Sequence, residues 1–215
     1  MDGIELSEIL TSIYGNLGWW PAESSEEVII GAILTQNTSW KNVEKAMQNL
    51  RKKSLNTLEG IHASTPKDLM ECIKPAGYFN VKSLYLREIS SKLIEYGGIE
   101  ELKKLDDIHL EQFIINIKGV GKETMQDIIL YAFHRKKFVI DKYTIRLFQR
   151  IGILESNSME NVTKSIEENL KLEEIKNFHG TIVELCKDYC RNKPLCKECP
   201  LNKTCKYYEN DFTEP

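Results

Sequence analysis

The sequence predicts an all-α fold, and three observations support this. Apolar residues recur at three- and four-residue spacing through most of the chain. Alternating strand patterns are nearly absent. Residues typical of helix starts, such as Thr65 before Pro66, stand ahead of several apolar stripes. Roughly ten short helices joined by tight turns are therefore expected, which is the pattern of an all-α protein.

The expected helices follow one another without an internal repeat or an obvious linker. Glycines at 77 and 97–98 interrupt the middle of the chain, and Ser24 and Ser158 are expected N-caps. The apolar stripes that define the helices lie at 6–17, 28–34, 43–50, onward from 66, 110–117, 128–132, 145–148, 162–166 and 178–189. With 215 residues, the chain has enough material for one or two compact domains with a real apolar core.

Charge is unevenly distributed along the chain. The formal net charge is −3, which does not by itself indicate a nucleic-acid-binding protein. Residues 118–150, however, hold eight Lys/Arg against three Asp/Glu, and residues 186–206 hold six against two. Basic segments on an acidic body can form a binding surface for phosphates, although solvated helix faces would give the same pattern.

Five of the six cysteines lie in the last thirty residues, at 186, 190, 196, 199 and 205. We expect no signal peptide and no membrane span, since MDGIELSEIL lacks a basic start and an uninterrupted apolar run. A cytoplasmic location is therefore expected. Disulfides would be out of place there, so the cysteines indicate a metal site.

The segment from Leu110 to Phe133 predicts two helices joined by Gly119-Val120-Gly121. Two glycines around one apolar residue permit a very tight reversal and expose backbone amides that can face a phosphate. Twenty residues later, a short apolar run ends at Asp141, an expected helix N-cap. An isolated aspartate in this position would be a cap and nothing more.

Taken together, the hairpin, the basic turn and the aspartate resemble the helix-hairpin-helix DNA glycosylases of the endonuclease III superfamily. The resemblance covers most of the chain. It implies two helical lobes: a barrel at 24–137, and a second lobe formed by 1–23 with 138–215. In that family the aspartate lies in the cleft between the lobes and is essential for cleaving the N-glycosidic bond, a role that falls here to Asp141. A helix N-terminus suits it, because the helix dipole favours an ionised carboxylate.

Two positions depart from the family pattern. Bifunctional members carry a nucleophilic lysine two residues after the second hairpin glycine, where this chain has Glu123, with Lys122 one place early. The usual proline before the hairpin is Lys118. Without the lysine, Schiff-base chemistry is not expected, and the protein is predicted to be a monofunctional hydrolase.

Cys190, Cys196, Cys199 and Cys205 give the spacing C-x5-C-x2-C-x5-C. This resembles the iron–sulfur loop of the same superfamily, usually C-x6-C-x2-C-x5-C. The resemblance implies a structural [4Fe–4S] cluster on these four cysteines and places Lys197 and Lys203 near the DNA backbone. A structural zinc site is the alternative, although zinc modules more often pair two C-x2-C knuckles.

Several short motifs (Trp19-Trp20-Pro21, LTQNT, GYFN and VIDKY) resemble the bacterial 3-methyladenine glycosylase branch of the superfamily. An electron-rich indole stacks well on a positively charged alkylated purine, although one of the two tryptophans can also be core packing. Either Gln36 or Asn37 is expected to fill the gap left by the extruded nucleotide. The base-pocket residues assigned from the sequence are Trp19, Trp20, Pro21, Lys142 and Glu123.

The sequence thus predicts a monomeric DNA N-glycosylase that acts on double-stranded DNA with a damaged base and removes alkylated purines such as 3-methyladenine. One alternative is a glycosylase for uracil, hypoxanthine or an oxidised base, or a lyase that uses Lys122 or Lys142. Another is a non-catalytic binder of DNA structures, against which Asp141 argues.

Overall fold

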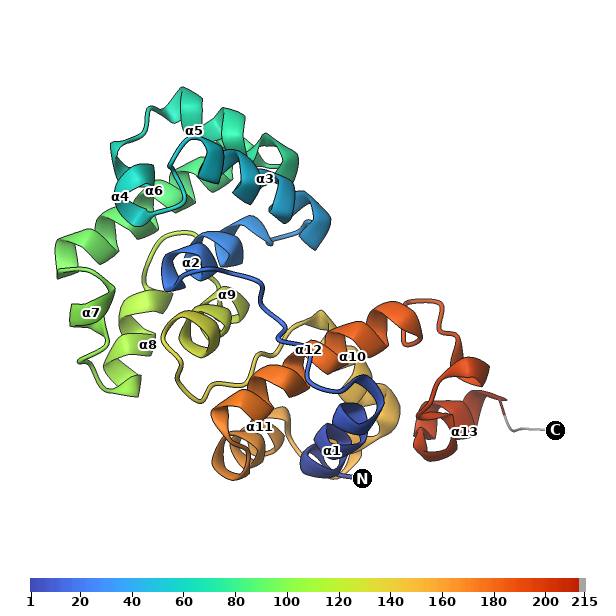
Figure 1. Ribbon diagram of the computed structural model, residues 1–215. Helices are drawn as coiled ribbons and strands as arrows, with labels where there is room; N and C mark the ends of the chain where they lie inside the picture. The colour runs from blue at the N-terminus through green and yellow to red at the C-terminus, as the bar shows by residue number, and fades with distance from the viewer. Residues whose placement is uncertain (213–215) are drawn as a thin grey trace. The chain divides into compact units, whose positions relative to one another are not determined.

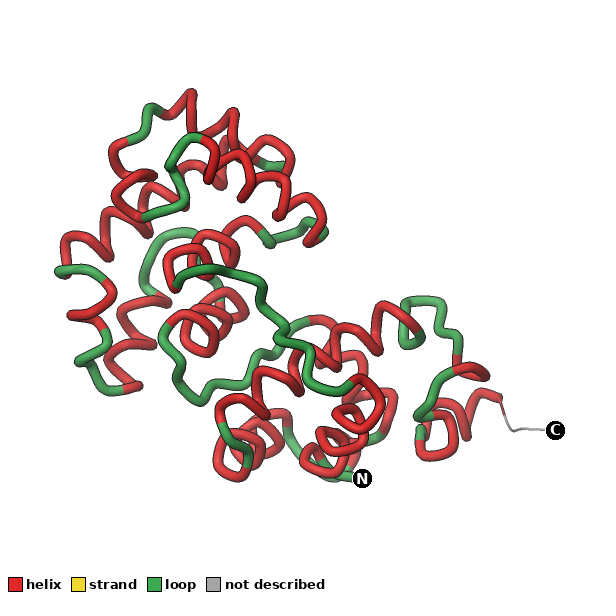
Figure 2. Tube along the Cα trace, viewed as in Figure 1, coloured by secondary structure: helices red, strands yellow, loops and turns green. Residues whose placement is uncertain are grey.

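The structure is a computed structural model, and it describes residues 1–212. All of the regular elements in this range are helices joined by loops, which confirms the all-α prediction (Figure 2). The chain divides into two compact units, one formed by residues 1–21 and 136–215 and the other by residues 22–135. These boundaries lie within two residues of the lobes expected from the sequence.

The unit at 22–135 is built around α2, which is buried from Glu27 to Leu34 because its sequence is almost wholly apolar. It packs against α3, α6 and η2 (Figure 1). The helices of this unit are α2 (Ser25–Leu34), α3 (Trp40–Lys52), α4 (Leu58–Ala63), α5 (Pro66–Ile73), η1 (Lys74–Ala76), α6 (Phe79–Tyr96), α7 (Ile99–Leu102), α8 (Asp107–Ile115), α9 (Lys122–Asp127) and the π-helical η2 (Ile128–Ala132).

Glu27 fixes the start of α2. Its carboxylate is 1% exposed and accepts two hydrogen bonds from Arg51 at the end of α3, at 2.7 and 2.6 Å. The Arg51 guanidinium, the amide of Asn56 and the backbone N–H of Glu23 together hold the pKa of Glu27 at about 2. A fully paired buried charge of this kind defines where α2 sits relative to α3.

The unit at 1–21 and 136–215 has α12 at its centre, packed against α1 and α10. Three stacked aromatic rings, Phe138, Phe148 and Phe178, form its core, with centroids 5.3 to 6.3 Å apart. Its helices are α1 (Gly3–Tyr14), α10 (Lys142–Ile151), η3 (Ile153–Glu155), α11 (Met159–Asn169), α12 (Leu172–Asp188), η4 (Cys196–Glu198), η5 (Asn202–Thr204) and α13 (Lys206–Phe212).

No helix among the described residues is long and apolar enough to cross a membrane.

Candidate active site and nucleic-acid interface

Asp141 is the N-cap of α10, as the sequence predicts. The buried run at Phe138 and Val139 leads into it, and its Oδ1 accepts a hydrogen bond from the backbone N–H of Thr144 at 2.7 Å. The Thr144 hydroxyl in turn donates to the carbonyl of Val139 at 3.2 Å, which fixes the turn before the helix. Asp141 is only 7% exposed, so the cap holds a carboxylate inside the protein.

A second ionisable group, His179, lies beside this carboxylate. It is 4% exposed on α12, and its Nε2 is 3.9 Å from Oδ2 of Asp141. Burial by itself raises the pKa of a carboxyl group, but here His179 and the N–H of Thr144 outweigh burial and hold the pKa of Asp141 below its ordinary value. His179 is not among the residues assigned from the sequence. Its only signal there is a histidine within the buried face of α12.

Trp19 packs on the same helix, at Gly180. A β-carbon on Gly180 would lie 2.7 Å from Cβ and Cγ of Trp19, so only glycine admits the indole this closely. The ammonium of Lys187 lies 4.7 Å from the centre of a Trp19 ring. Trp20 is half-buried and Pro21 is exposed. The position of Trp19 is therefore explained by its packing against Gly180.

The Gly119-Val120-Gly121 turn joins α8 to α9 as expected. Gly119 has a φ of +94°, and a β-carbon there would lie 2.2 to 2.7 Å from the Tyr85 ring of α6. Val120 is 8% exposed and anchors the turn inward. Gly121 is the exposed N-cap of α9, with open space around its α-carbon. The two glycines thus have different roles. Gly119 is required by its positive φ and by its contact with Tyr85, whereas Gly121 leaves the backbone accessible to a phosphate or another ligand.

The LTQNT turn after α2 separates its two polar residues. Gln36 points into the unit, where its Nε2 donates to the carbonyl of Gly119 at 2.9 Å and to the hydroxyl of Thr124 at 3.1 Å. Asn37 is exposed and has a φ of +55°. Gln36 therefore ties this turn to the hairpin, and Asn37 is the residue whose side chain is presented to solvent.

A buried lysine links the LTQNT turn to the GYFN turn. Lys82 is 2% exposed, and its ammonium donates to the carbonyls of Leu34 at 2.8 Å and Ala76 at 2.9 Å, the last residues of α2 and η1. Burial lowers the pKa of Lys82. Tyr78, just after η1, is 71% exposed with a φ of +47°. Asn37 and Tyr78 are both exposed and both have a left-handed backbone conformation. Each lies shortly after a helix whose last carbonyl accepts a hydrogen bond from the Lys82 ammonium.

The remaining charged residues assigned from the sequence are all exposed. Lys142 lies in the first turn of α10, with its ammonium 5.3 Å from the Tyr143 ring centre. Glu123 and Lys122 begin α9 beside the hairpin. Lys197 and Lys203 lie on η4 and η5. Their assignment to the base pocket or the DNA surface stays a prediction.

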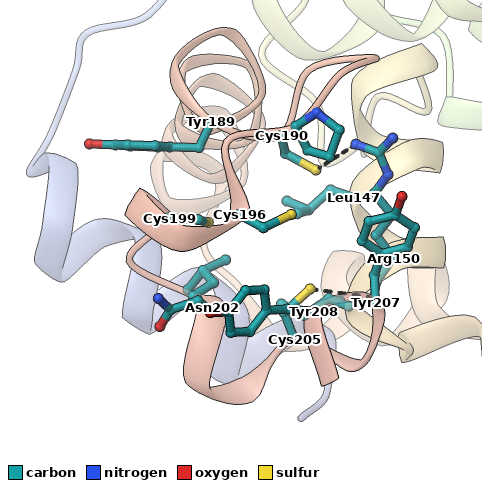
Figure 3. Close-up of a pocket in the computed structure, with 13 residues that line it drawn as sticks. Leu147, Arg150, Tyr189, Cys190, Cys196, Cys199, Asn202, Cys205, Tyr207 and Tyr208 are labelled. Carbon is teal, nitrogen blue, oxygen red and sulfur yellow. Dashed lines mark hydrogen bonds between the residues drawn. The ribbon is translucent and has the colours of Figure 1, made fainter. Parts of the chain in front are cut away.

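The four cysteines of the predicted cluster line one pocket that is partly open to solvent, shown in Figure 3. Cys190 follows α12 and is held by two arginines of α10. Arg150 donates to the Cys190 sulfur at 3.4 Å and Arg146 to its carbonyl at 2.8 Å. The Cys186 thiol and these guanidinium groups lower the pKa of Cys190, whereas burial raises that of Cys199 to about 11.

Within residues 1–212, no three His, Cys, Asp or Glu side chains are grouped as ligands of a metal ion. The pocket nevertheless suits a larger group. Four irons and four sulfides hold their thiolates farther apart than one ion does, and here four thiols line a single hollow beside two arginines. Four thiols that line one hollow are a donor set that an iron–sulfur cluster could use.

Comparison with known proteins decides the family. Residues 30–172 match the HhH-GPD superfamily of base excision DNA repair proteins. The chain belongs to the HhH-GPD superfamily. This confirms the resemblance drawn from the hairpin and Asp141, both of which lie inside the matched segment.

This HhH-GPD protein has relatives along nearly its whole length. A Methanocaldococcus jannaschii protein named as a DNA repair glycosylase is 44% identical over 207 residues, covering 94% of each chain. Endonuclease III of Thermotoga maritima is 29% identical, covering 84% of this chain and 82% of the relative. The solved structure of an H. pylori 3-methyladenine DNA glycosylase bound to 1,N6-ethenoadenine has a TM-score of 0.76 and 26% identity, covering 87% of this chain and 98% of that one.

The two hairpin glycines of this HhH-GPD protein should respond differently to substitution. Gly119→Ala places a side chain at positive φ against Tyr85, so we expect a loss of about 1–3 kcal/mol in the free energy of unfolding.

In Gly121→Asp the new side chain points into open space, so the variant should melt at the wild-type temperature. Its charge and bulk should, however, weaken binding of damaged and undamaged duplex alike.

Thermal denaturation and fluorescence anisotropy measure these two effects. Unchanged duplex affinity in the Gly121→Asp variant would show that the turn is only a structural corner.

Proposed function

We propose that this protein is a monofunctional DNA glycosylase that removes alkylated purines, such as 3-methyladenine, from duplex DNA. The observation that carries the proposal is the buried carboxylate of Asp141, kept ionised at a helix N-cap in an HhH-GPD chain. The reaction is hydrolysis: the bond from the base to C1′ of the sugar breaks, the base leaves with the bonding electrons, and water supplies the new oxygen at C1′.

Asp141 acts on the charge that develops during this reaction. As the base departs, the sugar gains oxocarbenium character, and a fixed negative charge nearby stabilises that cation. Stabilisation of this kind requires no reorganisation if the carboxylate is already held. The Thr144 N–H and the surrounding buried run hold it before substrate arrives.

The choice of lesion rests on two further features. N-alkylated purines carry positive charge and are good leaving groups, so they need little acid catalysis and gain from stacking on an indole. Because packing on Gly180 already accounts for Trp19, we assign the stacking role to Trp20 with Pro21. Similarity to the H. pylori 3-methyladenine DNA glycosylase also supports this substrate class.

A lyase activity is the second candidate, favoured by the similarity to T. maritima endonuclease III and by exposed Lys122 and Lys142. The two candidates differ in their products. A hydrolase leaves an intact strand with an abasic site, whereas a lysine nucleophile forms an imine that borohydride reduces to a stable protein–DNA adduct.

The products should therefore identify the reaction. On duplexes bearing methylated purines, uracil, hypoxanthine or oxidised bases, we expect release of free 3-methyladenine, strand breaks only after alkali, and no adduct with borohydride. Chromatography of released bases and denaturing gels provide the measurement. An adduct lost only in Lys122→Ala or Lys142→Ala would instead establish the lyase, and inactivity on every lesion would exclude glycosylase function.

We further propose that Asn37, rather than Gln36, enters the gap left by the extruded nucleotide, with Tyr78 as an exposed aromatic contact nearby. Exposure and orientation support this choice, because the Gln36 amide is already bound to Gly119 and Thr124. Asn37→Gly keeps the left-handed backbone and removes only the side chain. We expect it to fold normally and to slow single-turnover base release by about tenfold, as loss of one contact to the opened duplex would.

Gln36→Ala is the matched control for Asn37→Gly. It should lower the melting temperature, because two hydrogen bonds to the hairpin and α9 are lost, each worth about 1 kcal/mol. Slower release in Gln36→Ala with normal stability, and wild-type rates in Asn37→Gly, would reverse the assignment.

We propose that Cys190, Cys196, Cys199 and Cys205 hold a [4Fe–4S] cluster, which would supply structure to the loop rather than chemistry to the reaction. Anaerobically purified protein should be brown and contain about four irons per chain. Cys199→Ser should lose the colour, whereas Cys72→Ser, a buried cysteine of the other unit, should keep it. A colourless protein with one zinc per chain, measured by elemental analysis, would contradict the cluster.

A further inference from the structure

His179 is a buried ionisable group to which the proposed reaction gives no role. It belongs to α12, is 4% exposed, and faces the carboxylate of Asp141 with 3.9 Å between Nε2 and Oδ2. The other carboxylate oxygen, Oδ1, already accepts the backbone N–H of Thr144 at 2.7 Å. One oxygen of Asp141 is thus fixed by its own helix and the other faces α12.

His179 is one of three buried polar side chains on this part of α12. The other two, Asn177 and Thr181, form hydrogen bonds within the unit that do not involve Asp141. The backbone beside His179 cannot shift freely, because Gly180 is in close contact with Trp19. The carboxylate of Asp141 is the charged group that lies beside the His179 ring.

Other charged groups on the packed elements have contacts of their own. α1 and α10 are the helices that pack most closely on α12. The ionisable groups of these helices make the following contacts: Glu5 with the N-terminal amine, Tyr14 with Asp188, Lys142 with the Tyr143 ring, Arg146 and Arg150 with the backbone at 190–192, Lys176 with Glu173, and Lys187 with Glu184. Glu8 is exposed.

We propose that His179 is a positioning residue for Asp141: its ring lies beside the second carboxylate oxygen and favours the ionised, oriented form of this group. The proposal rests on the proposed glycosylase function, in which Asp141 faces a developing cation. His179 acts through Asp141 and does not itself touch the DNA or the base.

Removing His179 should change the pKa of Asp141 in a predictable direction. Burial favours the neutral form of a carboxyl group, and His179 is the side chain that most opposes this effect at Asp141. Without it the pKa of Asp141 should rise. A protonated Asp141 cannot stabilise a cation, so the fall in rate at acidic pH should begin at a higher pH in the variant.

The test compares three variants in single-turnover release of 3-methyladenine from methylated duplex DNA between pH 3.5 and 8, with the rate of spontaneous base loss subtracted at each pH. In His179→Leu the acidic fall in rate should move upward by about one pH unit, and the rate at pH 7 should drop about tenfold. His179→Gln retains a hydrogen-bond donor and should recover most of the rate at pH 7. Ile182→Val, at a buried position on the same helix, should change neither quantity.

An equal loss of rate at every pH in His179→Leu, with no recovery in His179→Gln, would overturn the proposal and leave His179 a structural residue. Failure of the glycosylase function is distinguishable, because the wild type would then release no base. The carboxyl pKa of Asp141, measured by carbon-13 NMR, still decides in that case. A higher pKa in His179→Leu supports the proposal, and an unchanged pKa overturns it.

Discussion

The cap that joins Asp141 to the backbone N–H of Thr144 places a charge inside the protein, and much of the surrounding unit serves to keep it there. A carboxylate that is 7% exposed loses most of its hydration and needs compensating partners. The N-terminus of α10 supplies one partner and His179 of α12 another. Both helices must therefore be held rigidly, and the stacked rings of Phe138, Phe148 and Phe178 fix them against each other.

The same two helices are joined again at their far ends. Arg146 and Arg150, one and two turns along α10 from the cap, both donate to the backbone that follows α12. Arg150 also donates to the sulfur of Cys190 (Figure 3). The cysteine loop thus supports the pair of helices that carry Asp141 and His179. A structural cluster at this place would act on the reaction only through the stiffness of these helices.

In the unit at 22–135, buried contacts fix the backbone of three turns. Lys82 holds the carbonyl ends of α2 and η1, Gln36 ties the first of these turns to the hairpin, and Tyr85 covers Gly119. Each interaction satisfies buried polar groups or fills the space beside a glycine. Asn37, Tyr78 and Gly121 are exposed at these turns, on a backbone that is already fixed.

Local features were predictable from the sequence, and long-range side-chain geometry was not. The helical stripes, the glycine hairpin and the Asp141 cap depend on neighbouring residues, so spacing reveals them. His179 lies 38 positions after Asp141 and is marked only by polarity within an apolar stripe. The choice between Gln36 and Asn37 depends on a partner more than eighty residues away, and the packing of Trp19 depends on one glycine of α12.

The rate of base release by Asp141→Asn distinguishes a catalytic carboxylate from a helix cap. Asparagine preserves the shape and much of the cap but removes the negative charge. We expect this variant to bind damaged duplex normally while its single-turnover rate falls roughly a hundredfold or more, a loss of about 3 kcal/mol of transition-state stabilisation. Near-normal turnover with wild-type affinity would show that the buried carboxylate is a helix cap and not the catalytic group.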